Sequence, residues 1–367
     1  MSTTDLDIDK LLLVAKKMRA SDVHMLEGER IAFRIDGDLH FLQLPPFDKK
    51  TMLSILHKMM PTHLSRELES QRGSDFAYQI GSEIRFRCVA YYSTGKLGLI
   101  MRLIPLNVPT IEELELPEVT RRISLEHRGM VLITGMTGSG KSTTLAAMIN
   151  FINQTDSLRI ITIEDPIEYV YKSEMSFISQ REIGRDVPDF NVALRQAMRM
   201  DPDVILVGEM RDVETIRVAI KAAETGHLVF STLHTTSAVH TVQRIIGYFP
   251  QNEHALLREQ LSLNMRASVT QRLVKRCDTP GRLAAMEIMV VNATISKLIY
   301  DDRIPDCFTV ITSRDDGMQS FDQALADLVR NKNISYEEGQ LHCEDEQRFK
   351  RFVQGVSSSG DRGGIIG

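Results

Sequence analysis

Val131-Leu-Ile-Thr-Gly-Met-Thr-Gly-Ser-Gly-Lys-Ser-Thr-Thr-Leu-Ala146 is the stretch of this sequence that decides the fold. Its first four residues, 131–134, predict a short buried strand. Gly135 then opens a loop that closes with Gly140-Lys-Ser142, and the spacing fits the phosphate-binding pattern G-x-x-x-x-G-K-[ST]. The good helix formers after this loop place it between a strand and a helix, which is the context that a phosphate loop requires.

Each residue type in this loop has a physical reason. Glycines at 135, 138 and 140 allow positive φ and a close approach of the backbone to an anion. The loop amides and the start of the helix supply partial positive charge, and Lys141 adds a full charge for the β- and γ-phosphates. The Ser142 hydroxyl is a candidate Mg²⁺ ligand. The predicted nucleotide-binding residues are Gly135, Thr137, Gly138, Ser139, Gly140, Lys141, Ser142 and Thr143.

The composition limits the class of protein. A chain of 367 residues predicts two domains, and 43% hydrophobic residues suffice for ordinary cores. The net charge of −5 argues against nucleic acid as the main partner. The four cysteines form no C-x-x-C pair, so a zinc site is not predicted. No apolar run reaches the ~18 residues of a membrane span. We therefore expect a cytoplasmic protein that reaches a membrane through protein partners.

Periodicity divides the chain into segments. Residues 1–104 predict a small α+β domain, with a hairpin turn at Asp36-Gly37-Asp38. Residues 105–117 contain three prolines and are interpreted as a linker. Residues 118–345 alternate short apolar strands with helices, as in a P-loop α/β core, and continue into C-terminal helices. Residues 346–367 are expected to form a flexible tail.

Acidic residues follow two of the predicted strands in the second domain. Asp203-Val-Ile-Leu-Val-Gly-Glu209 predicts a buried strand with Glu209 at its tip, where a carboxylate can hold Mg²⁺ or its water shell. Ile161-Thr-Ile-Glu-Asp-Pro-Ile-Glu168 is a second acidic strand end. A carboxylate there can orient and deprotonate an attacking water, and Glu164, Asp165 and Glu168 are the candidates.

Histidines and arginines complete the set of candidates. His227 and His234 flank the strand in Gly226-His-Leu-Val-Phe-Ser-Thr-Leu-His234. His234 is the preferred sensor of a γ-phosphate, and His227 is the weaker candidate. In the first domain, Arg87 and Arg102 lie on neighbouring predicted strands. Taken alone they are ordinary surface charges.

Together these motifs resemble the secretion-superfamily ATPases, in particular type IV pilus retraction ATPases of the PilT/PilU type. The resemblance rests on residues 135–142, 163–168, 201–212 and 224–234, in this order. It implies a hexameric ring of subunits in which a PAS-like domain precedes a RecA-like ATPase domain, with ATP bound between them. It also implies an inner-membrane platform protein as partner and pilus retraction as function.

The resemblance also implies roles for single residues. Glu209 is the Walker B acid, Glu168 the first choice for the catalytic glutamate and Glu164 the second. Arg87 and Arg102 match first-domain arginines that reach the γ-phosphate.

Two features keep alternatives open. Family members of the PilT type carry an Ala-Ile-Arg-Asn-Leu-Ile-Arg-Glu-like helix, whereas this chain has Ala293-Thr-Ile-Ser-Lys-Leu-Ile-Tyr300 without either arginine. The later Gly317–Leu325 segment and the tail are closer to PilU. An accessory ring subunit that acts with a second retraction ATPase is therefore one alternative. A pilus-assembly or type II secretion ATPase is another, disfavoured because no tetracysteine insert is present.

Overall fold

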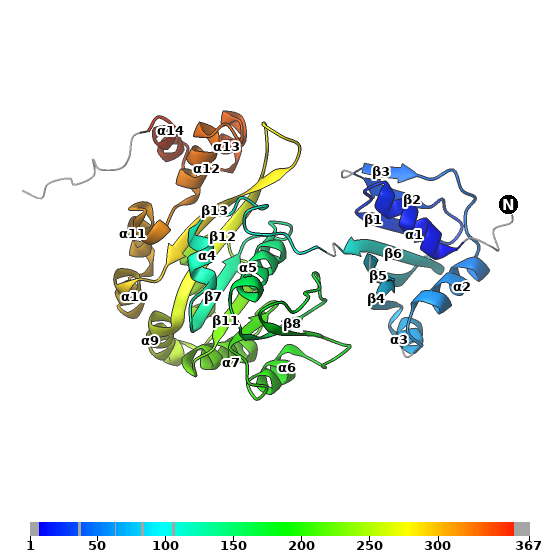
Figure 1. Cartoon of the computed structure of the whole chain (residues 1–367), viewed down its shortest axis with the longest axis horizontal. Coiled ribbons are helices and arrows are strands. Elements are labelled where there is room, and N and C mark those ends of the chain that lie inside the picture. Colours follow the sequence, from blue (N-terminus) through cyan, green and yellow to red (C-terminus); the bar gives the residue numbers. More distant parts are fainter. Residues whose placement is uncertain (1–6, 36–37, 63, 82–83, 105–106, 356–367) are drawn as a thin grey trace, which may run out of the picture. The chain divides into compact units, whose positions relative to one another are not determined.

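The computed structural model describes residues 7–355, except 36–37, 63, 82–83 and 105–106. The chain forms two compact units, residues 1–107 and 108–367 (Figure 1). The turn predicted at Asp36-Gly37 and the last twelve residues of the predicted tail, 356–367, lie outside the described residues.

The first unit is built on a six-stranded sheet in the order β3-β2-β1-β6-β5-β4. Every neighbouring pair is antiparallel. The strands are β1 (Asp22–Leu26), β2 (Ala32–Ile35), β3 (Asp38–Phe41), β4 (Gly73–Ile80), β5 (Ile84–Ser93) and β6 (Lys96–Ile104). The helices are α1 (Ile8–Lys17), α2 (Lys49–Met59) and α3 (Leu64–Gln71).

Local sequence explains why these helices start where they do. The side chains of Asp7 and Asp48 cap α1 and α2 by accepting from the backbone N–H groups of Asp9 and Thr51. Each of the two helices then buries one apolar stripe, such as Ile8, Leu11 and Leu12 of α1, in the core of this unit.

The second unit is built on a seven-stranded sheet in the order β13-β12-β7-β11-β10-β8-β9. All neighbouring pairs are parallel except β12 with β13, which is antiparallel. The strands are β7 (Gly129–Thr134), β8 (Arg159–Glu164), β9 (Phe177–Glu182), β10 (Val204–Val207), β11 (Leu228–Leu233), β12 (Met265–Lys275) and β13 (Arg282–Val290). The continuous apolar runs are typical of parallel strands covered on both faces.

Helices cover both faces of this sheet, and each face has its own core. Val131 and Ile133 of β7 pack on the side of α4 (Val119–Ser124) and α5 (Lys141–Thr155). Leu132 faces the opposite core. The elements of that side are α6 (Phe190–Ala197), α7 (Val213–Glu224), α8 (Ala238–Gly247), α9 (His254–Asn264), α10 (Ala293–Tyr300) and α11 (Cys307–Thr312).

The far ends of β12 and β13 carry a separate C-terminal cluster. It contains α12 (Phe321–Arg330), α13 (Tyr336–His342) and α14 (Glu346–Val353), which pack on Val274 and Leu283. The prediction of a flexible tail from residue 346 is therefore wrong for its first part. Phe349 of α14 is fully buried and its ring lies 5.4 Å from that of Tyr336.

Other differences from the sequence prediction have simple causes. The predicted linker contributes Ile111 and Leu116 to the core beside α5. This part of the linker is therefore packed on the second unit, although it contains prolines. The prediction missed β9, an edge strand with exposed Phe177 and few buried residues. It also missed α3 and α11, each of no more than eight residues.

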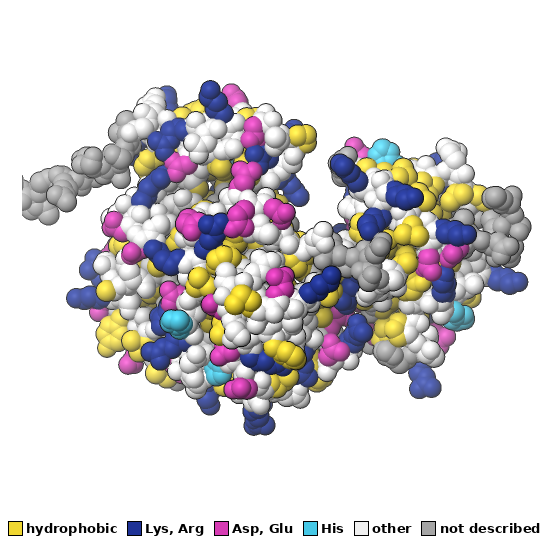
Figure 2. Space-filling model, viewed as in Figure 1, with side chains coloured by type: hydrophobic (Ala, Val, Ile, Leu, Met, Phe, Trp, Pro, Cys, Tyr) yellow, Lys and Arg dark blue, Asp and Glu magenta, His cyan; other side chains and the backbone are white. Residues whose placement is uncertain are grey.

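Surface charge is mixed on the face shown in Figure 2, where basic and acidic side chains are interspersed over the second unit. On this face, the described side chains therefore form no extended patch of one charge sign. Within the described residues, no helix combines the length and apolar character of a membrane span.

Replacement of Phe349 by alanine tests the docking of α14. We expect Phe349→Ala to lower the free energy of unfolding by about 3–5 kcal/mol, because it opens a cavity between Tyr336 and Gly339. Urea unfolding measures this loss. Leu341→Ala is the control, because Leu341 is 75% exposed and its removal leaves no cavity. Equal unfolding midpoints for the two variants would contradict the packing described.

Candidate functional site

Four loops of the second unit meet at one edge of its sheet. Strands β7, β11, β10 and β8 are neighbours and parallel, so their carboxyl ends lie together. The glycine-rich loop follows β7, Glu164 ends β8, Glu209 follows β10 and His234 follows β11. Crevices at the carboxyl ends of parallel strands are the usual ligand sites of open α/β sheets.

The glycine-rich loop has the backbone geometry of an anion cradle. Gly135, Gly138 and Gly140 have φ values of +136°, +79° and +88°. Gly140 is the N-cap of α5 and no side chain caps this helix, so its first N–H groups are available to a ligand. A Cβ at Gly135 would lie 2.5 Å from the Gln271 carbonyl oxygen, which explains glycine there. The loop therefore fits a phosphate group.

Lys141 lies over this loop. Its Nζ donates to the carbonyl oxygens of Gly135 and Met136, at 2.9 and 3.1 Å. Burial lowers the pKa of Lys141, while the carboxylates of Glu209 and Glu168 act in the opposite direction. Glu209 and Glu168 are thus the two acids whose charges act on Lys141.

Gln271 of β12 supports the loop from behind, and sequence reasoning missed it. Its side-chain Nε2 donates to the carbonyl of Ser139 at 2.5 Å, and Gln271 is almost completely buried. The neighbouring Thr270 hydroxyl is hydrogen-bonded to that of Thr134, the last residue before the loop, at 2.6 Å. Several polar residues occur along β12, so no specific sequence signal pointed to Gln271.

Glu209 is held by two basic side chains. Arg211 contacts its Oε2 at 2.8 Å, and Nε2 of His234 lies 3.2 Å from its Oε1. The structure thus brings the acid after β10 and the histidine after β11 into direct contact. In this position His234 can respond to a change in charge at Glu209.

The two glutamates after β8 have different environments. Glu164 accepts hydrogen bonds from Thr162 at 2.6 Å and from Gln180 at 3.2 Å. Burial nevertheless raises the pKa of Glu164 to about 7. Glu168 is exposed. The adjacent Tyr169 is hydrogen-bonded to Thr143, at the start of α5, at 3.1 Å, which fixes this loop beside the glycine-rich loop.

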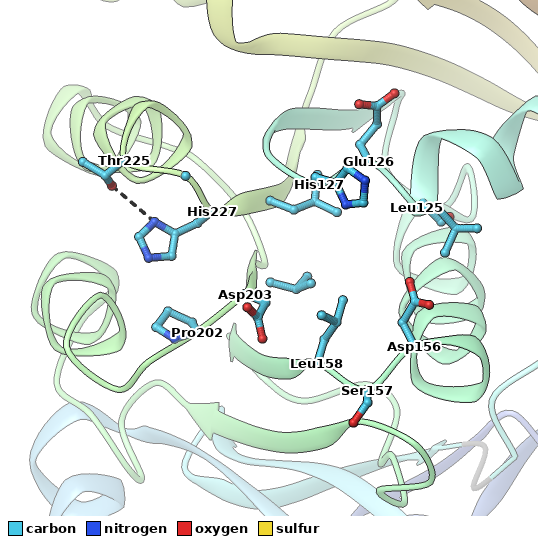
Figure 3. Close-up of a pocket in the computed structure, with 14 residues that line it drawn as sticks. Leu125, Glu126, His127, Asp156, Ser157, Leu158, Pro202, Asp203, Thr225 and His227 are labelled. Carbon is cyan, nitrogen blue, oxygen red and sulfur yellow. Dashed lines mark hydrogen bonds between the residues drawn. The ribbon is translucent and has the colours of Figure 1, made fainter.

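His227 lies at the opposite edge of the sheet, so a contact with the same phosphate is excluded. It precedes β11, whose six residues separate it from His234 by ~20 Å. There it lines a pocket of about 560 Å³ (Figure 3). Its Nδ1 is 2.9 Å from the Ala222 carbonyl and 3.2 Å from the Thr225 hydroxyl. The interpretation of His227 as a sensor is wrong, because strand length separates it from the loop edge.

In the first unit, Arg87 and Arg102 are direct cross-strand partners on β5 and β6. Their side chains therefore share one face of that sheet. Arg102 donates to the buried Asp22 at 2.8 Å, and Arg87 lies 3.6 Å from Asp75. More than half of the Arg102 side chain is exposed, so this ion pair leaves donors free for another anion.

Comparison with known proteins finds similarity over nearly the whole chain. The family model described as "Type II/IV secretion system protein" matches residues 3–348. The chain belongs to this family.

Individual family members match over similar lengths. The Pseudomonas aeruginosa PilT, a type IV pilus retraction ATPase, is 43% identical over 94% of this chain and 100% of its own. The type IV pilus ATPase PilU of the same organism is 35% identical over 96% and 93%. A crystal structure of the pilus retraction motor PilT with bound ADP has a TM-score of 0.89 at 38% identity, covering 95% of this chain and 100% of that chain.

Membership in the secretion ATPase family confirms several predictions. The fold is a RecA-like P-loop core preceded by a smaller α+β domain. The resemblance to retraction ATPases of the PilT/PilU type is also confirmed, and the chain is an ATPase of this family. Over the matched lengths, identity with PilT exceeds identity with PilU.

The protein groups at this sheet edge that fit a metal ion are oxygen ligands. Among the described residues, no group of three or more His, Cys, Asp or Glu side chains is placed to hold an ion. Glu209 and the hydroxyl of Ser142, near the start of α5, suit Mg²⁺, which is usually held by one or two protein oxygens together with phosphates and water.

The raised pKa of Glu164 predicts a pH-dependent stability. Its pKa is about 7 in the folded chain against an ordinary 4.5. The contribution of the protonated acid is complete below pH ~4.5 and is lost as the pH rises through ~7. We therefore expect Glu164→Gln, which stays neutral, to be increasingly more stable than the wild type between pH ~5 and ~8.

Urea unfolding at several pH values measures this difference. Glu174→Gln is the control, because Glu174 is exposed. A gap between Glu164→Gln and the wild type that stays constant with pH would show that Glu164 is already ionised throughout.

Proposed function

We propose that this chain is the principal motor of type IV pilus retraction, a homo-hexamer that hydrolyses Mg-ATP in the cytoplasm beside an inner-membrane platform protein. One observation carries the proposal: the glycine-rich loop, Glu209 and His234 meet at one sheet edge in a chain that matches PilT over its full length. The greater identity with PilT than with PilU favours the principal role over the accessory one.

Binding of the nucleotide is assigned to the loop and α5. The free N–H groups at the start of α5 and the Lys141 ammonium bind the β- and γ-phosphates. Ser142 and Glu209 would hold Mg²⁺, which neutralises charge on the phosphate oxygens. The backbone around Gly138 is open, so the triphosphate can approach it closely.

Cleavage is assigned to the acids. Glu168 is exposed and acts electrostatically on Lys141, so it is the proposed residue that orients and deprotonates the attacking water. Glu164 is the second candidate, because a pKa of about 7 suits a general base. His234 reports the loss of the γ-phosphate through its contact with Glu209.

Conversion of hydrolysis into motion is assigned to the first unit. We propose that Arg87 and Arg102, which share one sheet face, contact the γ-phosphate while it is present. Its release removes their partner and biases the first unit towards a different position. In a hexamer, successive cleavage events would move the platform protein and disassemble the filament. A second retraction ATPase is a further partner that this assignment accommodates.

Two variants separate nucleotide binding from cleavage. We expect Lys141→Ala to lose both ATP binding and phosphate release, because the loop loses its full positive charge. Glu168→Gln should retain ATP binding within a few-fold but reduce kcat by about 10²–10⁴-fold, because only water activation is lost.

Fluorescent-nucleotide titration and steady-state phosphate release measure the two properties. Lys221→Ala, which removes an exposed lysine of α7, is the control and should match the wild type. Full phosphate release by Lys141→Ala would refute the assignment of the site. Full activity of Glu168→Gln together with loss in Glu164→Gln would move the base to Glu164.

A further inference from the structure

Glu287, in the middle of β13, is a carboxylate that neither the phosphate site nor the cores explain. It is fully buried and pairs with Thr270 of β12. Its Oε1 accepts from the backbone N–H of Ala238, the first residue of α8, at 2.6 Å. Its Oε2 has no hydrogen-bond partner among the described residues. A buried carboxyl group with one unpartnered oxygen is costly to ionise.

The position of this contact points to the nucleotide site. Residues 235–237 connect His234 to the start of α8, and Ser237 is the N-cap of that helix. Glu287 therefore ties down the end of the short loop that begins at His234. Because His234 contacts Glu209 at 3.2 Å, the loop position sets the geometry of the acid assigned to Mg²⁺.

Arg272 holds the same loop from a second side. It lies on the same face of the sheet as Glu287 and is its diagonal neighbour, since Arg272 pairs with Ala285. Its guanidinium donates to the carbonyl oxygen of Thr236, at 3.5 Å. The same group donates to the carbonyl oxygen of His342 at 2.7 Å and to Glu344 at 2.9 Å.

Further contacts extend this network through the C-terminal cluster. The Arg272 guanidinium lies 4.0 Å from the ring centroid of Phe321, at the start of α12. Asp322, also of α12, accepts from the N–H groups of Glu344 and Asp345, at 2.7 and 3.4 Å. The helices α12, α13 and α14 are thereby joined through one arginine to the loop that carries His234.

We propose that Glu287 and Arg272 are positioning residues that fix the His234–Ser237 loop to the C-terminal helices and so couple those helices to Glu209. The proposal rests on the proposed function, because it takes Glu209 and His234 as parts of the hydrolytic site. It gives the chain a coupling route through β12 and β13, separate from the helix α10 that lacks the family's two arginines.

Charged groups near Glu287 affect its pKa, so a change in pH can test its role in the loop contact. Arg272 of β12 favours the carboxylate, whereas Asp322 of α12 and Glu344 oppose it. From α8, the N–H group of Ala238 also favours the carboxylate. Burial dominates and raises the pKa of Glu287 to about 7. The carboxylate that holds Ala238 and attracts Arg272 most strongly therefore forms as the pH rises through neutrality.

The test is steady-state phosphate release by the full chain from pH ~6 to ~8. Glu287→Gln retains the acceptor for Ala238 but cannot ionise. We expect its kcat to equal that of the wild type at low pH and to fall about threefold behind it at high pH, with the KM for ATP within about twofold. Glu287→Leu and Arg272→Leu should lower kcat about tenfold across the range with the same KM. Glu337→Gln, an exposed carboxylate of α13, is the control and should follow the wild type.

A second measurement does not depend on hydrolysis. Hydrogen exchange of the nucleotide-free chain should be faster at residues 235–240 in Glu287→Leu and Arg272→Leu than in Glu337→Gln. Wild-type kcat across the pH range in every variant that folds overturns the proposal, as does unchanged exchange at residues 235–240. If Glu287→Leu or Arg272→Leu does not fold, Glu287→Gln alone decides. If the wild type releases no phosphate, the proposed function fails. Hydrogen exchange at residues 235–240 then remains the test of whether Glu287 and Arg272 fix the loop.

Discussion

The site depends on one constraint: the parallel, in-register pairing of β7, β11, β10 and β8. Parallel strands end at the same edge, so the segments that follow them are brought together although they are distant in sequence. A slip of one residue in any pair would turn buried side chains to the other face. The apolar residues on both faces of these strands therefore help to bring Glu209 and His234 into contact.

Side chains of the strands β12 and β13 also contact the loops at this edge of the sheet. Gln271 on one face holds the Ser139 carbonyl of the phosphate loop, whereas Arg272 and Glu287 face the start of α8. Buried polar groups of this kind add little net stability, because desolvation offsets most of their interaction energy. Their value lies in geometry, since a polar contact specifies a position that apolar packing leaves adjustable.

Much of the candidate site was predictable from sequence because its signals are local. The glycine-lysine-serine pattern, the acid after an apolar strand and the histidine after the next strand each occupy a few consecutive residues. Gln271 and Glu287 gave only a weak signal, a polar residue within a strand, whose partner lies elsewhere in the chain. The spacing of His227 and His234 already placed them at opposite ends of one strand, and the six residues of β11 agree with that spacing.

The sequence by itself determined the phosphate loop, the two-part organisation and the α/β class, because backbone propensity and hydrophobic period act over short stretches. It also pointed to the family through four ordered motifs. Only the tertiary structure decided the strand order, the contact of His234 with Glu209, the docking of α14 through Phe349 and the burial of Glu287. These features depend on contacts between residues far apart in the chain, and no local pattern specifies which distant partner a buried group meets.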